Sequence, residues 1–117
     1  MANTVVVNKV ERGAKQFQGA FTDMWVVTST VSDQDAVAIG DTLAVAMTVP
    51  GVVLGDMVVG TSLTMDSLDA GGDGAVIRCE VTAANTVSLL IHADVAEFAA
   101  DAITGAVIKV LVGRPSW

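Results

Sequence analysis

The segment Thr42-Leu-Ala-Val-Ala-Met-Thr-Val49, followed by Pro50-Gly51, decides the fold class of this 117-residue chain. Successive side chains of a β-strand point to opposite faces. One face of this strand would carry the larger apolar residues Leu43, Val45, Met47 and Val49. The other would carry the small or polar residues Thr42, Ala44, Ala46 and Thr48. Proline lacks the amide hydrogen that a sheet needs, so Pro50-Gly51 ends the strand in a turn. The segment predicts a strand with one face in a core.

The sequence on both sides of this strand shows the same alternation of β-branched residues with turn residues. Further strands are predicted at Met24–Val31, Met57–Leu63, Ala75–Thr82, Thr86–His92 and Ala106–Arg114. Ala84-Asn85 separates two of them, and Asn tolerates a positive φ, so Val81–Val87 is predicted to be a hairpin. Residues 94–101 fit either a short helical turn or a loop. We therefore predict an all-β chain that folds as a small antiparallel β-sandwich or barrel-like domain.

Charge divides the chain near residue 22. Before it, Lys9, Arg12 and Lys15 outnumber Glu11, whereas the remainder carries three basic residues against twelve acids. We predict an extended N-terminal arm over 1–22 and a β domain over 23–117. The arm's apolar residues are too widely spaced to form a core alone, so we expect them to bind a partner. These candidate partner-binding residues are Val5, Val7, Val10, Phe17 and Phe21.

Composition argues against several functional classes. The net charge is −7, aromatic residues make up 4% and Tyr is absent, which disfavours nucleic-acid binding because such proteins present basic and aromatic surfaces. Every apolar run is interrupted long before the roughly 20 residues that span a bilayer, so no membrane partner is expected. A single cysteine cannot form an internal disulfide, and the N-terminus lacks a signal-peptide pattern. We expect synthesis in the cytoplasm.

Two residues are natural candidates for catalysis. His92 ends a predicted strand and is expected to face solvent or a neighbouring subunit, with no nucleophile motif beside it. Cys79 shares a strand face with Ile77 and Val81 and is expected to be buried and unreactive. We expect no catalytic residues and no enzymatic activity.

The segment 66–74, with Glu80 after it, partly resembles a calcium-binding loop. Gly71 stands where the loop needs an oxygen ligand, and the residues that follow predict a strand instead of a helix. The glycines at 71, 72 and 74 lack the lysine or helix that phosphate-binding loops use. We expect neither a metal nor any other cofactor.

Three segments carry a resemblance to a known family. The segment 49–60, Val-Pro-Gly-Val-Val-Leu-Gly-Asp-Met-Val-Val-Gly, resembles a pattern recurrent in small structural proteins of tailed bacteriophages. The segments 81–89 and 108–115 are similar to the hairpin and the closing strand of the same family. The resemblance spans about residues 40–115 and implies a decoration, cement, fibre or tail component without catalytic residues.

From the resemblance we expect a capsid decoration (cement) protein on the outer surface of a phage head. Its expected partners are the major capsid protein and further copies of itself, as a homotrimer. Trp117, the last residue, is expected to lie in an oligomer interface. The alternative is a head-fibre or tail domain that binds a host surface glycan or protein.

Overall fold

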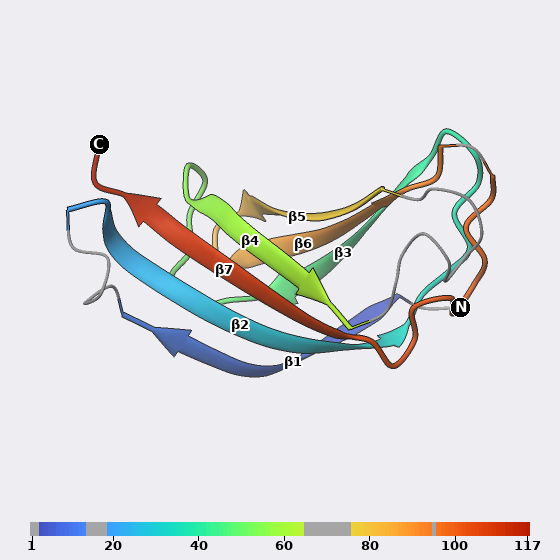
Figure 1. The fold of residues 1–117 in the computed structure, drawn as a ribbon, viewed down its shortest axis with the longest axis horizontal. Coiled ribbons are helices and arrows are strands. Elements are labelled where there is room, and N and C mark those ends of the chain that lie inside the picture. Colours follow the sequence, from blue (N-terminus) through green and yellow to red (C-terminus); the bar gives the residue numbers. More distant parts are fainter. Residues whose placement is uncertain (1–2, 14–18, 65–75, 95) are drawn as a thin grey trace.

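Two antiparallel sheets face each other in the computed structural model, which describes residues 3–13, 19–64, 76–94 and 96–117 (Figure 1). The strands are β1 (Thr4–Arg12), β2 (Phe21–Asp33), β3 (Thr42–Thr48), β4 (Met57–Leu63), β5 (Val76–Ala83), β6 (Thr86–His92) and β7 (Val107–Pro115). One sheet has four strands in the order β1-β2-β7-β4, and the other has three in the order β3-β6-β5. The chain is thus all-β, as predicted.

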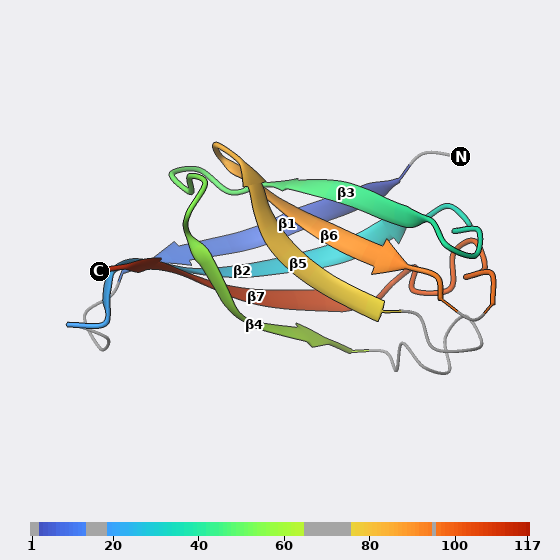
Figure 2. The same cartoon turned by 90° about the horizontal axis from the view of Figure 1, so that it is seen from above.

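The strand order makes the two sheets meet at both sides. β1 approaches β3 along one side, and β4 approaches β5 along the other (Figure 2). The Cys79 thiol of β5 is hydrogen-bonded to the Thr61 side chain of β4, which links the sheets at the second side. Strands therefore cover the core along both sides of the sandwich, and loops cover it at the two ends.

The core lies between the sheets and follows the alternation of each strand. On β2, Trp25, Val27 and Val31 point inward and are buried, whereas Val26 points outward. The same alternation buries the apolar faces of β3, β6 and β7: Val45, Met47, Val87, Leu89, Ile91, Ile108, Val110 and Val112. Each large apolar side chain removed from water contributes roughly 1.5–3 kcal/mol to folding. The two sheets are therefore held together by their facing apolar surfaces.

The predicted strands are confirmed within two or three residues at their ends. Met57–Leu63 and Thr86–His92 have the predicted bounds, and the strand predicted over Met24–Val31 is longer, at Phe21–Asp33. The hairpin between β5 and β6 is also confirmed, and Asn85 in its turn has a φ of 58°. Residues 94–101, apart from 95, form bends and a turn, with a bridge between Val37 and Phe98.

The N-terminal segment differs from the predicted arm. Thr4–Arg12 forms β1, which pairs along its whole length with β2, from Thr4 opposite Asp33 to Arg12 opposite Trp25. Charge alone suggested a separate segment, but the backbone hydrogen bonds of β2 need a partner on this side, and β1 supplies them. The domain therefore includes residues assigned by the sequence to the arm.

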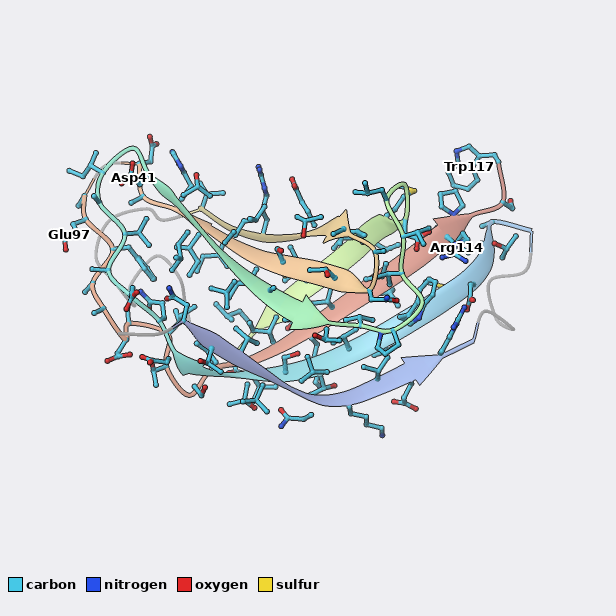
Figure 3. The ribbon with its side chains drawn as sticks, turned by 180° about the vertical axis from the view of Figure 1, so that it is seen from behind. Asp41, Glu97, Arg114 and Trp117 are labelled. Atoms are coloured by element: carbon cyan, nitrogen blue, oxygen red, sulfur yellow. The ribbon has the colours of Figure 1, made fainter. Side chains whose placement is uncertain are left out.

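The two ends of the sandwich differ in chemistry. Figure 3 shows Asp41 and Glu97 at one end and Arg114 and Trp117 at the other. At the first end, the buried Gln34 side chain ties the β2–β3 and β6–β7 loops together: its amide donates to the carbonyl of Ala99 and accepts from the amide of Ile103. We call this the acidic end, because six acids lie in its two loops or at the strand end beside them: Asp33, Asp35, Asp41, Asp94, Glu97 and Asp101.

Candidate functional site

The opposite end is organised around Trp25, and we call it the Trp25 end. It comprises Arg12, Asp23, Trp25, residues 49–57, Asn85, Arg114 and Trp117. The Trp25 side chain points inward from β2 and is fully buried. Its indole Nε1 donates a hydrogen bond of 3.1 Å to the carbonyl of Pro50, just after β3. The indole therefore joins the two sheets where the sandwich closes.

Two arginines lie against the Trp25 ring. The guanidinium carbon of Arg12 is 4.8 Å from the ring centre, and that of Arg114 is 5.2 Å from it. Both residues come from strands that flank β2, namely β1 and β7. A cation near the face of an indole is attracted by the ring's quadrupole. The pair of guanidinium groups thus shields the ring from solvent.

Each arginine is matched by a carboxylate. Arg12 Nε donates to Asp23 Oδ2 at 2.8 Å, and Arg114 donates to both oxygens of Asp56, at 2.9 and 3.0 Å. The Asp56 side chain is 2% exposed. The hydrogen bond from Arg12 lowers the pKa of Asp23. Burial opposes ionisation of Asp56, but hydrogen bonds from Arg114 and the backbone amide of Val53 outweigh it and lower the pKa of Asp56.

The segments 49–60, 81–89 and 108–115 meet at the Trp25 end. Asn85, in the hairpin turn, accepts a backbone hydrogen bond from Val49 and donates one to Val52, and its side chain accepts another from the amide of Gly51. Arg114 Nη2 donates to the carbonyl of Gly51 at 2.9 Å. Residues 49–60, 81–89 and 108–115 thus form one hydrogen-bonded unit.

Exposed apolar side chains rim this unit. Val53, Leu54 and Met57 point into solvent, and Leu54 is 69% exposed. Trp117 is 80% exposed, and its ring lies 6.1 Å from that of Phe21, centre to centre. The Phe21 ring covers Gly113, where a Cβ atom would lie 2.6 Å from the ring. The hydrogen-bonded residues of the Trp25 end are therefore bordered by an apolar rim made of Val53, Leu54, Met57 and Trp117.

Comparisons with protein-family models, with curated proteins and with solved structures found no match to this chain. Within the ranges that the structure describes, no three His, Cys, Asp or Glu side chains are grouped as a metal site would require. None of the described residues forms a helix long and apolar enough to cross a membrane.

The structure separates the predicted partner-binding residues instead of gathering them. Val5 is buried in the core and Val7 packs against it, because both point inward from β1. Val10 also points inward but lies at the open edge, where it is partly exposed. Phe21 is half-buried beside Trp117, and Phe17 lies outside the described residues. Among the predicted residues that the structure describes, Val5 is buried, Val7 and Phe21 are half-buried, and Val10 and Trp117 are exposed.

The catalytic candidates lie apart from one another. Cys79 is buried, as predicted, and burial raises the pKa of its thiol to about 11. His92 lies on the outer face of the three-stranded sheet, where Nδ1 is 2.9 Å from the Thr42 hydroxyl. Glu80, on the same face, pairs with Arg78 at 3.2 Å. The calcium-like segment 66–74 lies outside the described residues.

Of the residues at the Trp25 end, only Trp117 is predicted as a site residue from the sequence, whereas Trp25 and the two Arg–Asp pairs are not. Arg12, which charge places in the predicted arm, lies directly opposite Trp25 in the β1–β2 register. The available signal was the spacing of Arg12 from Asp23 and Trp25, which fits two strands joined by a short connection. Arg114 and Asp56 gave no such local signal, because 58 residues separate them.

Proposed function

We propose that this chain is a non-enzymatic structural protein of a tailed-phage virion, which decorates the outer surface of the head and stabilises contacts between capsomers. It would be made in the host cytoplasm and would dock onto the major capsid protein through the Trp25 end. One observation carries this proposal. The three segments that resemble phage structural proteins join into a single unit there, directly beneath the exposed apolar rim.

The distribution of charge favours the same orientation. At the Trp25 end both arginines are neutralised by Asp23 and Asp56, so docking leaves no unpaired charge from this set to desolvate. At the acidic end the two loops and the strand ends beside them, described over 32–42 and 93–106 without 95, include six acids and no Lys or Arg. Charged surfaces are costly to bury. The acidic end would therefore face solvent while Val53, Leu54 and Met57 of the apolar rim contact the capsid.

We also propose that copies of the chain associate, as a homotrimer, with Trp117 in the interface. An indole that is 80% exposed is a large apolar surface for a single chain to leave in water. Tryptophan is enriched among the residues that dominate protein interfaces. The ring contact with Phe21 orients Trp117 and reduces the entropy lost when a neighbour covers it.

The proposal can be tested by co-sedimentation with undecorated capsids. Leu54 and Ile39 are both exposed aliphatic residues, 69% and 60% respectively, in loops at opposite ends of the sandwich. We expect Leu54→Asp to weaken capsid binding at least tenfold and Ile39→Asp to leave it unchanged. Cryo-electron microscopy of decorated heads should show the Trp25 end against the capsid. Equal binding by both variants, or absence of the protein from any virion, would contradict the proposal.

One observation favours the alternative, a fibre or tail domain that binds a host glycan. Exposed aromatic rings such as Trp117 are suited to stacking against sugars, and the adjacent Phe21 enlarges this surface. Copy number separates the two functions, since hundreds of copies per virion indicate decoration and a dozen or fewer indicate a fibre. Glycan binding that Trp117→Ala abolishes would favour the fibre.

A further inference from the structure

A second surface lies on the outer face of the three-stranded sheet. A recess of about 350 Å³ is lined by one or two residues from each strand: Thr42, Val76, Arg78, Leu90 and His92. The pairing register explains why these residues meet. His92 lies between Thr42 and Val76 in one row, and Leu90 lies next to Arg78 in the adjacent row. The volume is at the lower end of the range of small-molecule sites.

The recess presents two kinds of hydrogen-bond donor. The Thr42 hydroxyl lies 2.9 Å from His92 Nδ1, which fixes the imidazole and leaves Nε2 without a hydrogen bond to any described residue. Arg78 uses Nε to contact Glu80 at 3.2 Å, and both side chains are more than half exposed. The structure gives the Arg78 guanidinium no other partner within the described part of the chain. Its two terminal nitrogens can therefore form the planar fork that matches a carboxylate.

The remaining walls are apolar. Val76 is half exposed, and Leu90 is half-buried beside it. An inorganic anion would leave these side chains unused, whereas a ligand with a short aliphatic body would cover them. The Arg78–Glu80 pair is an exposed ion pair, and such pairs are worth at most about 1 kcal/mol. Glu80 is thus a weak competitor for the guanidinium.

We propose that this recess binds a carboxylate carried on a short aliphatic body, either a free acid or the C-terminal residue of a peptide. Arg78 would hold the carboxylate in a bidentate geometry, His92 would donate from Nε2, and Val76 and Leu90 would contact the aliphatic part. The site does not involve the Trp25 end. A failure of the proposed capsid docking would therefore not count against carboxylate binding in the recess, and the reverse also holds.

The test is a chemical-shift titration of the full-length, ¹⁵N-labelled protein at low ionic strength. Butanoate is the probe, and butanamide is its neutral control of similar shape. We expect butanoate to shift the amide resonances of β3, β5 and β6 around the recess, with a Kd on the order of 1 mM. Butanamide should bind at least fivefold more weakly. Equal binding of the two, or shifts centred elsewhere, would overturn the proposal.

Three single-residue variants make the test specific. Arg78→Gln should weaken butanoate binding at least fivefold, and Glu80→Gln should strengthen it about twofold by removing the competing carboxylate. Lys109→Gln is the matched control, because it removes one exposed positive charge from the opposite sheet. If Lys109→Gln weakened binding as much as Arg78→Gln, the effect would be general electrostatics and the proposed site would be wrong.

A dipeptide ending in valine, with a free or an amidated C-terminus, identifies the source of the carboxylate. Tighter binding of the free-acid dipeptide than of butanoate would assign the recess to a peptide C-terminus. Weaker binding would assign it to a small free acid. Either result supports carboxylate recognition, whereas preferential binding of the amidated dipeptide would contradict it.

Discussion

The guanidinium of Arg114 lies over the ring of Trp25 and at the same time forms two hydrogen bonds with Asp56. One side chain of β7 thereby contacts the largest core residue of β2 and the loop that leads into β4. Arg114 Nη2 also donates a hydrogen bond to the carbonyl of Gly51. The end of the sandwich is closed by a charge pair whose carboxylate is almost fully buried.

Loss of Arg114 should destabilise the fold. Arg114→Met would leave the Asp56 carboxylate buried without its cation, and we expect the free energy of unfolding to fall by about 2–3 kcal/mol. Arg78→Met is the control, because Arg78 belongs to an exposed pair, and a change below about 1 kcal/mol is expected there. Urea denaturation measures both. A similar small loss in both variants would contradict the structural role of Arg114.

Acid should weaken the Trp25 end. The pKa values of Asp23 and Asp56 are lowered in the folded protein, so both carboxylates bind protons more readily when unfolded. Their contribution to stability is therefore complete above the unfolded pKa of about 4 and is lost as the pH falls through the folded values. We expect Asp56→Asn to be less stable than the parent at pH 7, with the difference shrinking toward pH 2. A difference that does not change with pH would show that Asp56 is not ionised.

Gly51 is expected to be sensitive to substitution for two reasons. Its φ is +96°, and an added Cβ would lie 2.7 Å from an Arg12 nitrogen over Trp25. Gly55 has a similar φ of +101° but open space around it. Gly55→Ala should cost about 1 kcal/mol for backbone strain alone, and Gly51→Ala should cost more. Thermal melts compare the two, and equal losses would show that Arg12 moves aside freely.

The placement of β1 in the sheet can be tested at two adjacent residues. Val5 points into the core at 8% exposure, and Val6 points outward at 46%. Val5→Asp should destabilise the protein by at least about 3 kcal/mol because it buries a charge, and Val6→Asp should change stability by less than about 0.5 kcal/mol. Chemical denaturation provides the measurement. If 1–22 were a detached arm, both variants would be as stable as the parent.

Cys79 should react slowly with thiol reagents. It is buried, and its thiol pKa of about 11 leaves about one thousandth of the group as thiolate at pH 8. We expect the native protein to be labelled far more slowly than the protein in denaturant. Cys79→Ser should cost about 1–3 kcal/mol, because a hydroxyl replaces a small apolar group. Rapid labelling of the native protein would place Cys79 at the surface.

Local patterns in the sequence were sufficient to locate the strands of the β domain. The alternation at Thr42–Val49 and the turn at Ala84-Asn85 are local signals, because a period of two and a positive φ depend only on neighbouring residues. The same local alternation predicted the inward face of Cys79. It also predicted that His92 lies on the outer face of its strand.

The pairing of the strands and the contacts between distant residues depend instead on the three-dimensional arrangement of the whole domain. The basic residues of 1–22 suggested an arm, yet β1 fills the edge of the four-stranded sheet because β2 offers unpaired backbone groups there. Arg114 reaches Asp56 across 58 residues, and Thr42 reaches His92 across 50. Such contacts are set by strand order and register, which follow from burying both apolar sheet faces at once. No local pattern in the chain encodes them.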